Sequence, residues 1–100
     1  PSLVGSEMCI REALSRDYIE SHGYREAFGH SLGHGIGLDI HEGPLLSKNA
    51  KGIIQVNNCV TIEPGIYVDG LGGVRIEDDI LITENGCEVF TKCTKDLIIL

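Results

Sequence analysis

The sequence predicts an α+β protein in which one main helix packs on an antiparallel, curved sheet. Apolar residues recur at helical spacing in one early segment, residues 5–23. From residue 53 onward, β-branched and other apolar residues form strand-like runs that glycine-rich turns separate. A chain of 100 residues is long enough for one domain of this kind.

Residues 5–23 are expected to form the helix. Ser6 is the expected N-cap, because its hydroxyl accepts a hydrogen bond from a free backbone N–H of the first turn. Gly23 is the expected residue after the helix, because glycine adopts the left-handed conformation without strain. The expected buried stripe consists of Ile10, Ala13, Leu14 and either Tyr18 or Ile19.

Residues 25–44 contain too many glycines for a helix and end at Pro44, so they are expected to form short extended pieces and turns. A polar loop is expected over residues 45–52. The remaining chain is expected to be a set of antiparallel strands.

Two strand-like runs, residues 53–69 and 72–83, are joined by a glycine-rich turn. Asn85 followed by Gly86 is typical of a tight hairpin turn, and residues 87–93 are the expected return strand.

The first hairpin brings two glutamates together if it turns about Gly70, because Glu63 and Glu77 are equally far from that residue. Side chains alternate along a strand, so both glutamates share one face. That face would also carry Tyr67, Arg75 and Asp79, whereas the core face would carry Ile62, Ile66, Val68, Val74, Ile76 and Ile80. Facing carboxylates repel unless a cation lies between them or they share a proton. The alternatives are a solvated sheet face, or a register shifted by a kink at Pro64.

Three of the four histidines fall in the short stretch from residue 30 to residue 41. In an extended chain His30 and His34 lie roughly 13 Å apart, whereas a metal–nitrogen bond is about 2.1 Å long. One of them is therefore expected to bind an ion and the other to stand off in the pocket. The segment also contains Gly33, Gly35 and Gly37. These glycines exclude the helix of an H-x-x-x-H zinc site and are expected to let the backbone approach a substrate or ion closely.

His34, Glu63 and Glu77 together offer one nitrogen and two carboxylates. This donor set favours a hard or borderline ion such as Mn²⁺, Co²⁺ or Zn²⁺. Three ligands suffice for a single catalytic zinc with an open position. Two glutamates able to bridge fit a two-metal site better, which requires more oxygen ligands than the sequence offers.

Composition excludes several classes of partner. The formal net charge is −7 and there is no tryptophan, which disfavours binding to phosphate backbones or stacked bases. No apolar run is long enough to span a bilayer, and no signal peptide is visible. We therefore expect neither a nucleic-acid nor a membrane partner.

None of the four cysteines stands in a C-x-x-C pair, which disfavours a structural zinc site. We interpret them as small buried or half-buried thiols, typical of a reducing cytoplasm. The alternative is a disulfide between Cys87 and Cys93.

Three stretches, GHSLGHGIGLDIHEGP, TIEPGIYV and GGVRIEDDILIT, resemble the C-terminal half of the catalytic domain of the pita-bread (creatinase/aminopeptidase-like) metallopeptidases. Within that superfamily they resemble the Xaa-Pro aminopeptidase and Xaa-Pro dipeptidase (prolidase) branch. Gly65 favours this branch, since methionine aminopeptidases usually carry a methionine there. The resemblance implies that residues 1–100 are the C-terminal part of such a domain, whose N-terminal half is absent.

The resemblance assigns a role to each matching residue. It implies that His34 is the histidine ligand of one metal, that Glu63 binds metal and shuttles a proton as acid/base, and that Glu77 bridges both ions. The supporting residues would be the pocket histidines His30 and His41, which steady the tetrahedral intermediate and contact the substrate, together with Arg75 and Tyr67 beside the ligands.

The implied activity is hydrolysis of the peptide bond before proline, with two divalent ions (Mn, Co or Zn) and a peptide substrate that has proline in the second position. A cytoplasmic homodimer is the implied state of the full-length parent. The family also uses two aspartates, in a segment resembling D-x-G, and nothing before His30 supplies them. The chain alone is therefore expected to bind one ion or none and to be inactive. The alternatives are a metal-free creatinase-like hydrolase, or a non-catalytic binding module of the same fold.

Overall fold

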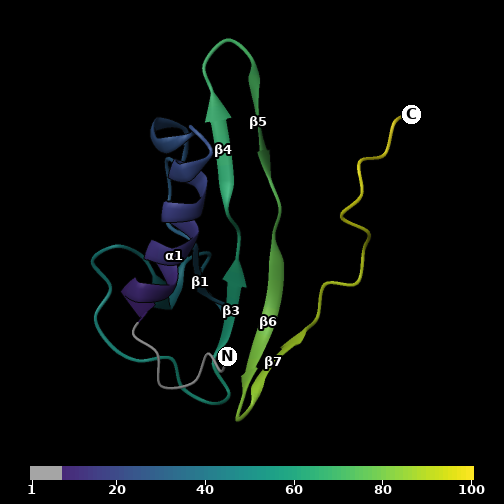
Figure 1. Ribbon diagram of the computed structural model, residues 1–100. Helices are drawn as coiled ribbons and strands as arrows, with labels where there is room; N and C mark the ends of the chain where they lie inside the picture. Colours follow the sequence, from purple (N-terminus) through teal and green to yellow (C-terminus); the bar gives the residue numbers. More distant parts are fainter. Residues whose placement is uncertain (1–7) are drawn as a thin grey trace.

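The computed structural model describes the backbone of residues 8–100 and the side chains of residues 12–100. Within this range, helix α1 (Met8–Ser21) and the short 3-10 helix η1 (Arg25–Ala27) precede seven strands. The strands are β1 (Gly33–Gly35), β2 (Glu42–Leu46), β3 (Cys59–Ile62), β4 (Gly65–Val68), β5 (Gly72–Arg75), β6 (Asp78–Thr83) and β7 (Gly86–Val89). The predicted α+β class is confirmed, and α1 lies alongside the strands (Figure 1). Within residues 8–100, no helix combines the length and apolar character needed to cross a membrane.

The end of α1 has the predicted glycine cap. Gly23 adopts a φ of 87°, and its N–H donates to the carbonyl of Glu20 at 3.0 Å. The N–H of Tyr24 donates to the carbonyl of Ile19 at 3.2 Å. These two bonds form a Schellman motif, which satisfies carbonyls that the helix leaves free. The predicted N-cap, Ser6, lies outside the described residues.

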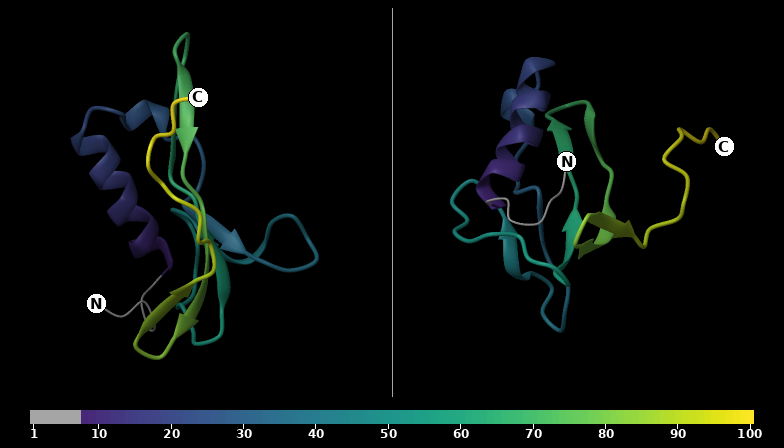
Figure 2. Two further views of the ribbon diagram at one scale, coloured as in Figure 1. Left: turned by 90° about the vertical axis from the view of Figure 1, so that its right-hand side faces the viewer. Right: turned by 60° about the horizontal axis from the view of Figure 1, so that its bottom comes forward.

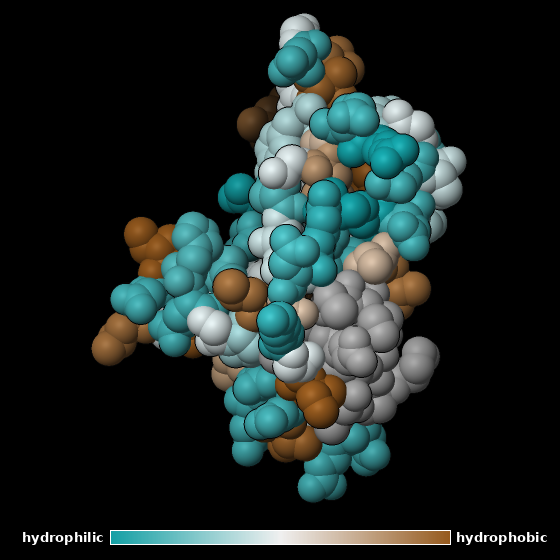
Figure 3. Space-filling view, turned by 90° about the vertical axis from the view of Figure 1, so that its left-hand side faces the viewer, coloured by the Kyte–Doolittle hydropathy of each residue, from teal (hydrophilic) through white to brown (hydrophobic). Residues whose placement is uncertain are grey.

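The predicted apolar stripe of α1 is wrong at Ala13, Leu14 and Tyr18, whereas Ile19 is half-buried. The side chain of Ile10 lies outside the described residues. Leu14 is 56% exposed and Tyr18 is 68% exposed, whereas the Glu12 side chain is fully buried. The reason is helical geometry: residues four apart share a face, and the face turned inward carries Glu12 and Arg16, joined by an ion pair. Leu14 and Tyr18 point away from that face. Figure 3 accordingly shows mostly hydrophilic side chains on the helical side of the molecule.

The strands form two antiparallel groups, a five-stranded sheet in the order β2-β1-β3-β6-β7 and the two-stranded ribbon β4-β5. The long hairpin runs from β3 through β4 and β5 to β6, so it has two ladders, β3–β6 and β4–β5. Both ladders share one register about Gly70, because Cys59 pairs with Leu81 and Gly65 pairs with Arg75. Between the ladders, the N–H of Ile76 donates to the carbonyl of Pro64 at 3.3 Å. The predicted hairpin is confirmed, and Pro64 does not shift its register.

The core lies in the five-stranded sheet. It consists of Leu32, Leu46, Ile54, Val60, Ile80 and Ile82, with Ala50, Ile62 and Val89 packed against it. The predicted core face holds at Ile80 but is wrong for Val74 and Ile76, which are 55% and 46% exposed. Those two residues belong to the part of the hairpin that projects beyond the five-stranded sheet (Figure 1). Leu46, predicted to lie in a polar loop, instead ends β2 and is buried.

The last hairpin is shorter than predicted. Thr83 pairs with Gly86, so the turn consists of Glu84 and Asn85, and β7 ends at Val89. Residues 36–41 form a loop that projects from the side of the sheet away from α1 (Figure 2).

Among the described cysteines, Cys59 is half-buried, whereas Cys87 and Cys93 are free and exposed. The alternative of a disulfide between them is wrong, as is their expected burial.

Candidate metal centre

Strand β1 places His34 between two neighbouring strands, β2 and β3. Glycines flank the histidine because the neighbouring backbones are very close. A Cβ added at Gly33 would lie 2.8 Å from the carbonyl carbon of Thr61, and one at Gly35 would lie 2.6 Å from that of Gly43. The expectation that these glycines approach a ligand is therefore corrected: they allow close packing of strand against strand. The β1–β2 register also shifts between His34 and Gly35, and such irregularities re-aim side chains.

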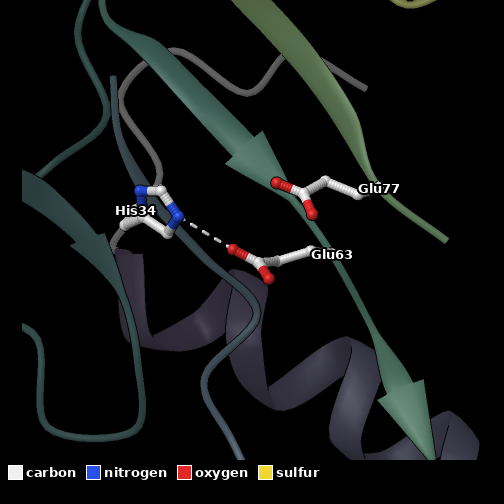
Figure 4. A group of neighbouring side chains, drawn as sticks. All are labelled: His34, Glu63 and Glu77. Carbon is white, nitrogen blue, oxygen red and sulfur yellow. Dashed lines mark ion pairs between the residues drawn. The ribbon is translucent and has the colours of Figure 1, made fainter. Parts of the chain in front are cut away.

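The side chains of His34, Glu63 and Glu77 converge at the break in the long hairpin, which is the short stretch between its two ladders (Figure 4). His34 Nε2 lies 2.9 Å from Glu63 Oε1. Each of His34, Glu63 and Glu77 offers a ligand atom, and these atoms all lie within 4.8 Å of one another. The side chains of His34 and Glu63 are 16% and 13% exposed, and that of Glu77 is 36% exposed. The structure thus brings together the three residues that the sequence singled out as candidate ligands.

A buried threonine connects two members of this group. The Thr61 hydroxyl donates to Glu63 Oε1 at 3.0 Å and accepts from the backbone N–H of His34 at 3.1 Å. His34 Nδ1 lies 2.9 Å from the carbonyl oxygen of Gly35. The sequence analysis missed Thr61, which is 3% exposed. The available signal was its position two residues before Glu63, on the same face of the strand.

Arg75 is the cation that faces both carboxylates. Its Nε lies 3.4 Å from Glu77 Oε2 and 3.8 Å from Glu63 Oε2. A hydrogen bond with Tyr67 and the negative charges of Glu77 and Glu63 raise the pKa of Arg75. The guanidinium therefore stays charged. Two carboxylates against one guanidinium still leave an excess of negative charge.

The other predicted pocket residues lie around this group. His30 Nε2 is 3.0 Å from the Tyr67 hydroxyl, and the two rings lie 5.4 Å apart. A Cβ at Gly65 would lie 2.8 Å from the Tyr67 hydroxyl, so glycine makes room for this pair. The exposed His41 meets His34 edge to face, with ring centroids 4.7 Å apart. His30 and His34 therefore have separate partners.

Two contacts beyond the cluster involve the chain that follows β7. Lys95 Nζ lies 3.0 Å from Asp78 Oδ1. The backbone N–H of the adjacent Asp79 donates to the Thr91 hydroxyl at 2.9 Å. These contacts attach the chain after β7 to the strand that follows Glu77.

The donors at the break fit a divalent cation. One imidazole nitrogen and two carboxylates suit hard or borderline ions. The Nδ1 contact with Gly35 fixes the ring of His34 so that Nε2 faces the carboxylates, the arrangement usual for a metal-binding histidine. The negative excess of the two glutamates over Arg75 is the charge that such an ion would balance.

The fold and this donor group point to the pita-bread metallopeptidases as the class of protein. The family model for metallopeptidase family M24 matches residues 5–84, and the chain belongs to this family. It is 45% identical over 98 residues to an Xaa-Pro dipeptidase from Pyrococcus furiosus, a match that covers 98% of the chain and 27% of the relative. The chain thus spans about a quarter of the length of such relatives.

Solved structures show the same likeness. An Xaa-Pro dipeptidase from Bacillus anthracis superposes with a TM-score of 0.93 at 55% identity, covering 97% of this chain and 27% of that one. An X-Pro aminopeptidase from Thermotoga maritima also gives a TM-score of 0.93, at 40% identity, covering 99% of this chain and 28% of that one. The predicted family and fold are therefore confirmed.

Proposed function

We propose that the whole protein is a metal-dependent peptidase that hydrolyses the bond preceding proline, as an Xaa-Pro dipeptidase or aminopeptidase. The observation that carries the proposal is the convergence of His34, Glu63 and Glu77 within 4.8 Å. It is supported by membership of the metallopeptidase family and by the names of the similar proteins. The two names leave dipeptidase and aminopeptidase equally open.

In this proposal His34, Glu63 and Glu77 hold two divalent ions together with oxygen ligands from elsewhere in the protein. When bound, such ions supply Lewis acidity and lower the pKa of water that attacks the scissile carbonyl. Arg75 helps to hold the two carboxylates in place, with its Nε 3.4 Å from Glu77 Oε2 and 3.8 Å from Glu63 Oε2. Thr61 orients Glu63 through its hydroxyl.

The remaining residues act on the peptide itself. Glu63 carries a proton to the leaving nitrogen, a role that requires a carboxylate within reach of the reacting atoms. His30 and His41 contact the substrate and steady the tetrahedral intermediate, a role that the family resemblance implies for both. Tyr67 fixes His30, because its hydroxyl lies 3.0 Å from Nε2.

A metal-free relative or a non-catalytic module is the competing function. Neither requires two glutamates and a histidine with their donor atoms facing one another. Both glutamates are present and lie beside His34, which favours the metal-dependent enzyme.

The test is hydrolysis by the whole protein loaded with Mn²⁺ or Co²⁺, using an Xaa-Pro dipeptide and an Xaa-Ala dipeptide. We expect cleavage of the proline substrate only, and a fall in kcat of at least about 100-fold in Glu63→Gln, because general acid–base groups contribute about 10²–10⁴. Glu84→Gln, in the exposed turn before β7, is the matched control and should leave kcat unchanged. Activity that survives both metal removal and Glu63→Gln would refute the proposal.

The 100-residue chain alone should bind Mn²⁺ or Co²⁺ weakly, because it supplies three ligands to a site for which the family resemblance implies five. Isothermal titration measures this directly. Sub-micromolar binding of two ions by the chain would contradict the proposed division of ligands.

A further inference from the structure

A buried ion pair on α1 lies outside the candidate metal centre. Arg16 Nε is 2.6 Å from Glu12 Oε1, and their side chains are 15% and 0% exposed. Among the described residues, Glu12 Oε2 has no hydrogen-bond partner. Such a pair is an expensive way to stabilise a fold, because desolvation of the two charges offsets most of their attraction. Its presence therefore points to a more specific role.

The other nitrogens of Arg16 bind the segment that leads to His30. One terminal nitrogen donates to the carbonyl of Phe28 at 3.2 Å, and the other donates to the carbonyl of His30 at 3.3 Å. The guanidinium also lies over the Phe28 ring, 4.4 Å from its centroid. The two carbonyls flank Gly29, in a segment that belongs to no helix or strand. Arg16 thus supplies hydrogen bonds that a sheet ladder supplies elsewhere.

The contacts continue from this segment to the candidate site. The rings of Phe28 and His30 lie 5.5 Å apart, and Phe28 is buried. His30 Nδ1 lies 2.8 Å from the carbonyl of Ser31, and its Nε2 meets the Tyr67 hydroxyl. Tyr67 also raises the pKa of Arg75, the arginine beside the two glutamates. A continuous series of contacts therefore runs from α1 through Phe28 and His30 to Tyr67.

We propose that Glu12 and Arg16 are positioning residues that hold the backbone at His30, so that its ring stays against Tyr67. The catalytic value of this positioning rests on the function proposed above, whereas the positioning itself does not. The planar fork of an arginine is required, because one nitrogen binds Glu12 while two others bind separate carbonyls. A lysine keeps the charge but offers a single flexible ammonium group.

The first test is NMR spectroscopy of the 100-residue chain, with ¹⁵N-labelled histidine and NOEs between the rings of His30 and Tyr67. In Arg16→Lys we expect loss of this NOE and a shift of the His30 ring nitrogens, with the His34 signals unchanged. Arg25→Lys is the matched control, since Arg25 is 76% exposed and lies 3.6 Å from Glu20. It should change neither signal.

A second variant separates positioning from folding. Glu12→Leu combined with Arg16→Met removes both charges and keeps apolar volume, so that the fold is retained. The His30–Tyr67 NOE should still be lost. The proposal is overturned if the NOE persists in either variant, if Arg25→Lys has the same effect, or if the unsubstituted chain shows no such NOE.

In the whole protein, Arg16→Lys should lower kcat for an Xaa-Pro dipeptide about 10-fold or more at unchanged metal content, since small misplacements of catalytic groups are costly. Arg25→Lys should leave kcat unchanged. If the NOE is lost while kcat is unchanged, the proposal that Arg16 positions His30 stands, and the catalytic role proposed for His30 is refuted.

Discussion

The substitution Gly33→Ala should separate β1 from β3 and move His34. The new Cβ would lie 2.8 Å from the carbonyl carbon of Thr61, and closer still to the carbonyl oxygen. Relaxed carbon–carbon contacts are about 3.5–4.0 Å long, so the strands must part by about 1 Å. The bond from the His34 N–H to the Thr61 hydroxyl, now 3.1 Å, would then lengthen beyond hydrogen-bonding distance.

Two consequences can be measured. Overpacking of this kind costs about 1–3 kcal/mol, and loss of the His34–Thr61 bond adds about 1 kcal/mol, so urea unfolding of the chain should show a loss of about 2–4 kcal/mol. The signals of the His34 ring should shift in the NMR spectrum. Gly29→Ala is the matched control, because nothing lies within 4 Å of its added Cβ and its φ is not positive. Equal unfolding free energies for the two variants would refute the steric reasoning.

Three further outcomes are expected from urea unfolding and NMR. Ile82→Ala should destabilise the chain by about 2–5 kcal/mol, since Ile82 is 1% exposed in the core, and a loss under 1 kcal/mol would contradict its central place. Gly23→Ala should cost about 1 kcal/mol, because its φ of 87° strains any residue with a Cβ, whereas an unchanged stability would argue against the helix cap. Gly65→Ala should weaken the NOE between His30 and Tyr67, as its Cβ would lie 3.0 Å from His30 Nε2; a full-strength NOE would count against the crowding described.

The local features of the fold were predictable from the sequence. The hairpin about Gly70 followed from two strand-like runs and a glycine-rich turn, and it placed Glu63 opposite Glu77 correctly. The helix end at Gly23 followed from the conformational preference of glycine. These features depend on residues close together in the chain, so spacing alone specifies them.

Spacing alone did not predict the contacts between distant segments, and the meeting of His34 with the two glutamates followed from the family resemblance. Nothing in the spacing of His34 and Thr61 indicates that β1 lies beside β3. Glu12 and Arg16 look like solvent-facing charges, because charged residues are almost never fully buried unless paired. Their burial depends on the carbonyls of Phe28 and His30, which the chain brings to α1 only in three dimensions.

The common register of the two hairpin ladders restricts how this stretch can change length over evolutionary time. Deleting one residue between Glu63 and the turn would slip the pairing by one position, and a slip of one turns every side chain on that strand to the opposite face. The carboxylate of Glu63 would then no longer face that of Glu77. Insertions and deletions in lineages that keep both acids should therefore collect at the exposed tip around Gly70 and Leu71, where pairing has already ended.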